Sequence, residues 1–138
     1  MERVLELGGY SARYCGRLFV QTGYSVSRVK SSPKPGWASR MAMNLFLDVE
    51  KQNLDTFRQD LPDSFDVVIV EANSADEAIN LGIEEWKNAI VVVITPFGLS
   101  GPRRNWKATS STLLAMGGYT QLMGDEGRTP LTLSLIHI

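Results

Sequence analysis

The clearest concentration of residues that could bind a ligand is a turn at residues 96–102, which reads Pro-Phe-Gly-Leu-Ser-Gly-Pro. The turn directly follows an apolar, β-branched run at residues 89–95, which is typical of a strand buried on both faces of a parallel sheet. Its glycines and prolines end that strand and fix a turn at the carboxyl end, where open α/β sheets bind their ligands. Arg103, Arg104 and Lys107 follow closely. These cations predict either a solvated loop or contacts with an anionic ligand.

A second candidate site is the turn formed by Gly8, Gly9, Tyr10 and Ser11, between a predicted strand and a predicted helix. A helix N-terminus can hold an anion there because its first backbone N–H groups lack partners within the helix. A dinucleotide site would read G-x-G-x-x-G, whereas this chain has adjacent glycines and then the bulky Tyr10. Residues 4–8 also resemble the first motif of class I methyltransferases, but the later glycines of that motif are missing. A tight strand-to-helix turn is therefore favoured over either kind of nucleotide site.

Segments with strand character alternate with segments of helical character along the chain. Ser11 is the expected N-cap of the first helix and Gly23 its expected end, and the first strand–helix–strand unit implies a parallel pair with a right-handed crossover. We expect one domain with an α/β fold: a Rossmann-like, open and mainly parallel sheet with helices on both faces. The expected strands are residues 4–7, 25–29, 44–47, 65–71 and 89–95, and the expected helices are about residues 12–22, 50–59 and 76–81.

Length, charge and cysteine content narrow the class of protein. The 138 residues suffice for one domain with a sizeable core, and 43% hydrophobic with 21% charged residues is typical of a soluble globular protein. A net charge of −1 provides no basic field for nucleic acid or an acidic membrane. The single cysteine, Cys15, excludes an internal disulfide, and the sequence shows neither signal-peptide features nor a membrane-length apolar run. We expect a cytoplasmic protein without a nucleic-acid or membrane partner.

Several patterns together resemble the family III CoA-transferases, the relatives of formyl-CoA transferase, carnitine CoA-transferase and α-methylacyl-CoA racemase. The segment from the first strand to the second continues the family pattern without a gap, and the resemblance extends over residues 3–133, the first part of a family chain. The other matching elements are F-G-x-x-G-P at residues 97–102, Trp106, G-G-Y at residues 117–119, Gly124, and Pro130 with Leu131.

The resemblance implies a site for coenzyme A. Residues 37–48 align with the family motif N-x-x-K-R-S-h-x-h-D-h, in which h is an apolar residue. In the family, the basic pair of this motif lies beside the CoA phosphates. This chain lacks the basic pair, and Arg40 is either the cation nearby or a solvated surface residue. Asn73, in place of the family's E-N-F-x-P-G turn, either binds the pantetheine arm or caps the next helix, and we favour the cap. The CoA-binding residues implied by the resemblance are Tyr10, Ser11, Ser31, Arg40, Met41, Ala42, Asn73 and Lys107. Residues 117–119 either end a helix or belong to a loop that closes over acyl-CoA intermediates.

The resemblance also implies an activity: transfer of CoA between carboxylic acids, with acyl-CoA and a carboxylic acid as substrates and no metal. The key aspartate of the family forms mixed anhydrides in the transferases, whereas the racemases use an acid/base pair. This aspartate lies beyond the segment matched by Pro130 and Leu131. We therefore expect residues 1–133 to be the N-terminal part of a homodimeric parent enzyme, inactive and prone to aggregate by itself, and residues 134–138 to be a non-native tail.

Alternatives to a CoA-transferase stay open. The replaced motif elements fall at cofactor positions while the core pattern persists, which favours a non-catalytic CoA-transferase-like domain as a second hypothesis. An enzyme of the α-methylacyl-CoA racemase type has the same N-terminal pattern. A methyltransferase rests on residues 4–8 alone.

Overall fold

The computed structural model describes residues 2–29, 41–123 and 127–128. The chain divides into two compact units, Met1–Asn105 and Trp106–Ile138, and each is described by itself. Ser31, Arg40 and the expected tail at residues 134–138 lie outside the described residues.

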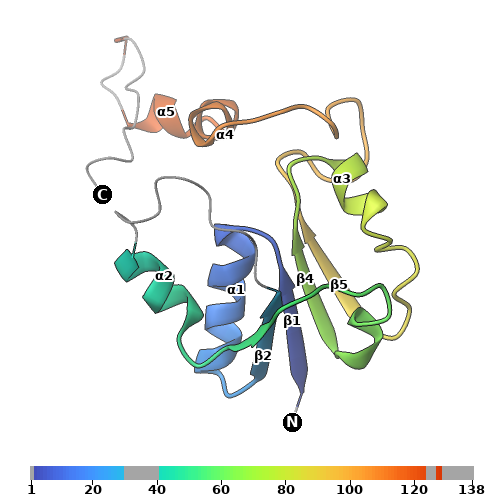
Figure 1. Cartoon of the computed structure of the whole chain (residues 1–138). Helices are drawn as coiled ribbons and strands as arrows, with labels where there is room; N and C mark the ends of the chain where they lie inside the picture. Colours follow the sequence, from blue (N-terminus) through green and yellow to red (C-terminus); the bar gives the residue numbers. More distant parts are fainter. Residues whose placement is uncertain (1, 30–40, 124–126, 129–138) are drawn as a thin grey trace. The chain divides into compact units, whose positions relative to one another are not determined.

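A five-stranded parallel sheet forms the centre of the unit Met1–Asn105 (Figure 1). Its order is β3-β2-β1-β4-β5, and every neighbouring pair is parallel. Val4 lies opposite Val26 on one side and opposite Val67 on the other, so the first strand of the chain is the central one. The expected Rossmann-like α/β fold is confirmed. The strands are β1 (Arg3–Leu7), β2 (Ser25–Val29), β3 (Gln52–Leu54), β4 (Val67–Glu71) and β5 (Ile90–Ile94).

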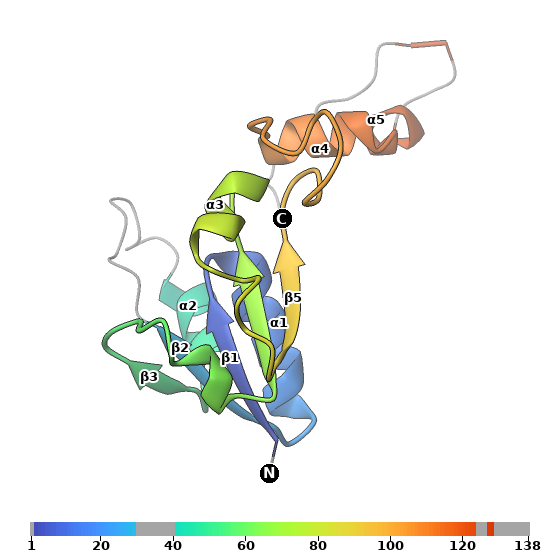
Figure 2. The same cartoon turned by 90° about the vertical axis from the view of Figure 1, so that its right-hand side faces the viewer.

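Helices cover both faces of this sheet (Figure 2). Successive strand residues point to opposite faces, so β1 and β4 contribute to two separate cores. Leu5 and Val68 pack with α3 (Ala75–Asn80) and Trp86, whereas Val4 and Ile69 pack with Ala12 of α1 (Tyr10–Gln21). A short 3-10 helix, Pro62–Ser64, precedes β4.

Two expected elements between β2 and β4 are wrong. Residues 44–47 belong to a helix, α2 (Met41–Asp48), because Asn44 and Asp48 stand four residues apart and both bind Arg13 of α1. The helix expected at residues 50–59 is absent from this described segment, which instead contains β3. Glu50 has a φ of 64°, a backbone conformation that ends a helix and is uncommon outside glycine. It turns the chain so that Lys51 enters the interior.

Burial differs between the two apolar strands β4 and β5. Val68, Ile69 and Val70 of β4 are fully buried. In β5, which is an edge strand, Ile90 is 68% exposed and Val92 41% exposed. The expectation that this strand is buried on both faces is therefore wrong for the described chain.

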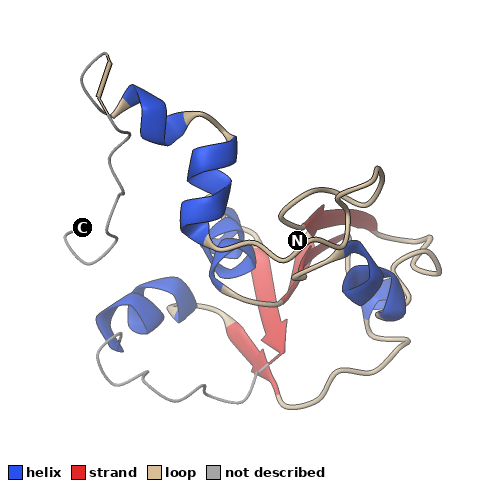
Figure 3. Ribbon diagram, turned by 90° about the horizontal axis from the view of Figure 1, so that it is seen from above, coloured by secondary structure: helices blue, strands red, loops and turns tan. Residues whose placement is uncertain are grey.

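The described part of the unit Trp106–Ile138 contains two short helices, α4 (Ser110–Met116) and α5 (Tyr119–Leu122) (Figure 3). The Thr109 hydroxyl caps α4 by accepting the Thr112 N–H at 3.2 Å. Gly117 is the C-cap of α4, and Gly118 follows with a φ of 77°. A left-handed residue at this position favours glycine, so the simpler interpretation of the Gly117-Gly118 pair as a helix end is confirmed.

Candidate functional site

The carboxyl ends of β1, β4 and β5 lie at the same edge of the sheet because the strands are parallel neighbours. Turns leave this edge at residues 8–9, 72–74 and 95–105, and all three belong to the unit Met1–Asn105. In open α/β sheets ligands bind at this edge, where the chain direction switches from one side of the first strand to the other. We therefore call these three turns, with the first turn of α1, the carboxyl-edge site.

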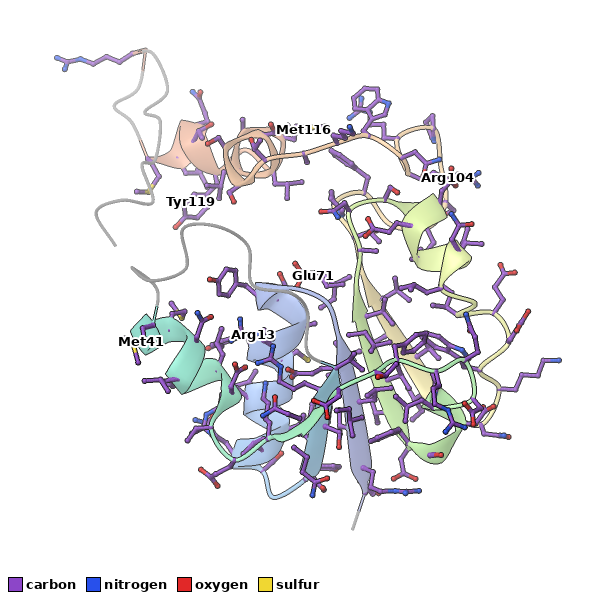
Figure 4. The ribbon with its side chains drawn as sticks, viewed as in Figure 1. Arg13, Met41, Glu71, Arg104, Met116 and Tyr119 are labelled. Atoms are coloured by element: carbon purple, nitrogen blue, oxygen red, sulfur yellow. The ribbon has the colours of Figure 1, made fainter. Side chains whose placement is uncertain are left out.

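Glu71, the last residue of β4, directs its carboxylate at the first turn of α1 (Figure 4). Its Oε2 accepts the Ala12 N–H at 2.9 Å. Gly8 and Gly9 permit this approach: a Cβ on Gly8 would lie 2.7 Å from the Glu71 Cβ, and a Cβ on Gly9 would lie 2.8 Å from Glu71 Oε1. Helix α1 begins at Tyr10 with Gly9 as its N-cap, so the expectation that Ser11 is the N-cap is wrong.

Ser74, and not Asn73, caps the helix that follows β4. The Ser74 hydroxyl accepts the Glu77 N–H at 3.2 Å. Glu77 Oε2 in turn accepts the Asn73 side-chain amide at 2.9 Å and the Asn73 N–H at 2.8 Å. The S-x-x-E pattern at residues 74–77 predicts the Ser74 cap, whereas the Glu77 carboxylate accepts from Asn73, the residue before the cap. Asn73 remains exposed at the carboxyl edge.

The loop after β5 returns to the first turn of α3. Asn105 Nδ2 donates to Asp76 Oδ2 at 2.7 Å, and the Asp76 N–H donates to Asn105 Oδ1 at 3.1 Å. The Arg104 carbonyl accepts the Ala75 N–H at 3.1 Å, and the Arg104 guanidinium lies 3.6 Å from the Asp76 carboxylate (Figure 4). These contacts hold the far end of the glycine- and proline-rich turn against α3, while its near end follows directly from β5.

Five charged side chains form an ionic cluster between the sheet, α1 and α2. Lys51 Nζ donates to Glu6 Oε2 at 2.6 Å and to the Arg13 carbonyl at 2.7 Å. Arg13 donates to both carboxylate oxygens of Asp48, at 3.0 Å from Nε and 2.8 Å from Nη2. Arg28 contacts Asp48 and lies 3.9 Å from Glu6. The members of the ionic cluster are Glu6, Arg13, Arg28, Asp48 and Lys51.

Burial dominates the electrostatics of Glu6, which is 2% exposed. Removal from water disfavours the charged carboxylate and raises the pKa of Glu6 from 4.5 to about 7, even though Lys51 and Arg28 lower it. Glu6 Oε1 has no hydrogen-bond partner among the described residues. Burial also lowers the pKa of Lys51. Glu6 is thus a buried carboxyl group that can gain or lose a proton near neutral pH.

The structure places some of the predicted CoA-binding residues together and leaves the others apart. Tyr10, Ser11 and Asn73 all belong to the carboxyl-edge site, and the Arg13 guanidinium lies 5.5 Å from the centre of the Tyr10 ring. Met41 and Ala42 begin α2 and are exposed (Figure 4). Lys107 is exposed in the unit Trp106–Ile138. A contact of any of these residues with CoA stays a prediction.

The sequence did hold signals for Glu71 and the ionic cluster, which the motif patterns missed. Glu6 interrupts an otherwise apolar strand between Leu5 and Leu7. A charged residue at such a position is buried with a partner. Glu71 has the same character, since it ends the apolar run of β4. Neither residue's partner can be identified without knowing that β1 lies between β2 and β4.

Two classes of feature are not found in the described part of the chain. Within residues 2–29, 41–123 and 127–128, the acidic, histidine and cysteine side chains form no group of three or more that could hold a metal ion. Over the same residues, every helix is too short or too polar to cross a lipid bilayer.

Comparison with known proteins supports both the fold and the resemblance. No model of a protein family matches the chain. A stretch of 48 residues, 35% of this chain, is 35% identical to the probable CoA-transferase Rv1866 of Mycobacterium tuberculosis and covers 6% of that protein. The crystal structure of Rv3272 from M. tuberculosis is similar over 97% of this chain and 42% of its own, with a TM-score of 0.71 at 20% identity. An imine reductase variant from Myxococcus stipitatus, in complex with NAD+, has a TM-score of 0.48 at 15% identity, over 88% of this chain and 35% of its own. This similarity is too low to support a statement about the present chain.

These comparisons define the class of protein first by its fold, which is α/β and Rossmann-like. The resemblance to CoA-transferases is confirmed as a sequence similarity over part of the chain. The chain spans less than half the length of the Rv3272 chain, at 42%.

Proposed function

We propose that this chain is the CoA-thioester-binding part of a family III CoA-transferase, whose parent protein moves CoA between carboxylic acids. The observation that carries the proposal is the 48-residue similarity to a probable CoA-transferase, at 35% identity. The fold similarity to Rv3272 is consistent with it, because it extends over 97% of this chain. In the parent protein, acyl-CoA and a carboxylic acid are the substrates, and the parent assembles as a homodimer in the cytoplasm.

The carboxyl-edge site supports this assignment through its chemistry. It offers the Ser11 hydroxyl and the Asn73 side-chain amide, both on exposed residues. Such groups donate to and accept from the amides of a pantetheine arm. The Tyr10 ring provides an apolar surface at the same turn. Separately, within the unit Trp106–Ile138, Lys107 is an exposed cation of the kind that binds phosphate.

A test is calorimetric titration of the whole chain with CoA and with acetyl-CoA. We expect saturable binding that weakens about fivefold in Asn73→Ala and in Ser11→Ala, the effect of one lost hydrogen bond. Asn88→Ala and Ser64→Ala are matched controls, because both residues are exposed and precede β5 and β4, at the opposite edge of the sheet. Wild-type affinity should persist in both controls.

The same titration separates the alternatives. If the wild-type chain gives no heat of binding with acetyl-CoA or with CoA, the binding proposal is contradicted and a non-catalytic domain is favoured. Saturable binding of S-adenosylmethionine in place of CoA would instead support the methyltransferase hypothesis. Equal weakening by the Asn73 and Asn88 substitutions would show that the carboxyl edge is not the binding site.

A further inference from the structure

The first turn of α1 already holds an anion, and that anion belongs to the chain itself. Helix α1 has 12 residues, and its N-terminus carries the partial positive charge and unpaired N–H groups that attract phosphate in Rossmann-like folds. In this structure Glu71 Oε2 accepts the Ala12 N–H at 2.9 Å. The carboxylate therefore lies where a bound phosphate oxygen would lie in a dinucleotide site.

Close packing against Gly8 and Gly9 holds Glu71 in this position. The Gly8 Cα faces the Glu71 backbone, and a Cβ there would lie 2.7 Å from the Glu71 carbonyl oxygen. At Gly9 a Cβ would lie 2.8 Å from Glu71 Oε1 and 3.3 Å from Oε2. The two glycines of this turn thus make room for a side chain of the neighbouring strand. In a dinucleotide-binding turn, glycines make room for the ligand's pyrophosphate.

We propose that Glu71 is a specificity-determining residue that excludes phosphate groups from the first βα turn of this fold. A phosphate at α1 would meet a fixed negative charge at the N–H groups that it needs, and both space and charge oppose it. A ligand that passes this turn must present an uncharged or hydrogen-bond-donating group to it. The inference does not rest on the proposed function, since it applies to any phosphate-bearing ligand, dinucleotides included.

The experiment uses inorganic pyrophosphate as the probe at constant ionic strength, with the backbone amides of residues 9–12 followed by two-dimensional NMR of the whole chain. In the wild-type protein we expect no saturable shift of these amides. In Glu71→Ala we expect saturable shifts at Ala12 and its neighbours, with an affinity at least tenfold above the upper limit that the wild-type titration sets. Glu84→Ala removes the same charge from an exposed position and should behave as wild type.

Glu71→Gln covers the case in which the alanine variant does not fold. Glutamine keeps the size of the side chain and an oxygen that accepts the Ala12 N–H, but it removes the charge, so we expect weaker yet measurable pyrophosphate binding. Saturable shifts at residues 9–12 in the wild-type protein would overturn the proposal, whatever the variants do. A folded Glu71→Ala or Glu71→Gln chain that ignores pyrophosphate would overturn it as well. If neither variant folds, the wild-type titration alone decides.

Discussion

Replacing Gly16 with alanine should destabilise the protein, although the same change in an ordinary helix is stabilising. Gly16 is buried within α1 and faces the Glu6–Lys51 pair. A methyl group there would overlap Glu6 Oε2 and lie 3.1 Å from Lys51 Nζ. The carboxylate would have to move, and its 2.6 Å hydrogen bond with Lys51 would break inside the protein.

The magnitude follows from two opposing effects. Alanine in a helix interior gains about 1 kcal/mol over glycine. Breaking a buried ion pair while both charges stay buried costs about 3–5 kcal/mol. The free energy of unfolding should therefore fall by about 2–4 kcal/mol, which is large against a typical total of about 5–15 kcal/mol.

Urea denaturation followed by tryptophan fluorescence measures this change, because Trp86 is buried in the core. The matched background is Glu6→Ala/Lys51→Met, in which the overlapping carboxylate is gone. There the Gly16→Ala substitution should be neutral or slightly stabilising. If Gly16→Ala raises the unfolding free energy in the wild-type background, the close packing of the ion pair against α1 is refuted.

Three further predictions concern pH, capping and the sheet edge. Because burial raises the pKa of Glu6 from 4.5 to about 7, the folded protein keeps a proton that the unfolded chain releases between these values. The stability that Glu6 contributes is thus fully present below about pH 4.5 and is lost as the pH rises to about 7. The melting temperature of Glu6→Gln should not show this decline. Identical pH profiles of melting temperature in the wild type and Glu6→Gln would contradict the prediction. Ser74→Ala should lower the unfolding free energy by about 1 kcal/mol through loss of the α3 cap, and Asn73→Ala should lower it less; the reverse order in chemical denaturation would show that Asn73 is the cap. The double substitution Ile90→Lys/Val92→Lys should raise the monomer fraction in size-exclusion chromatography with little change in stability, since both side chains are exposed on an edge strand. An unchanged aggregate peak would show that another surface causes the aggregation.

The elements with strong local signals could be predicted from the sequence. The runs that became β1, β2, β4 and β5 are apolar and β-branched or alternate, and glycine ends α1 close to the expected position. Strand β3 has no such signal, because Gln52 and Asn53 are exposed on an edge strand and are not apolar. It is specified by its pairing with β2. The exposure of β5 was also unpredictable, since strand composition does not say which strand lies at the edge.

Helix α2 shows why local composition misled the prediction. Its residues are apolar enough for a strand, and several of them are exposed, among them Met41, Leu45 and Phe46. The inward positions are the polar ones, since Asn44 and Asp48 bind Arg13. An apolar run is normally assigned to the core, and this helix buries Leu47 alone. Only the position of Arg13 in the fold reveals the reversal.

The turns of the candidate site could be located from glycine and proline, but their occupants could not. The adjacent glycines at positions 8 and 9 depart from the dinucleotide motif. That Glu71 fills the space depends on β4 lying next to β1, which no pattern near either residue encodes. Long-range neighbours of this kind set the chemistry of the site.

The central place of β1 has a consequence for the order in which the protein is made. Arg3 pairs with Asp66, 63 residues further along the chain, and at roughly 5–20 residues per second a ribosome needs several seconds to make that span. During this time β1 can pair with β2 and be covered by α1, but its other edge has no partner. Lys51, which binds the Glu6 carboxylate, follows Glu6 by 45 residues. The Glu6 carboxyl group therefore also lacks this partner until Lys51 has been made. The strand that leaves the ribosome first thus keeps one open edge until β4 has been made, and that edge is where a chaperone or a second nascent chain would bind.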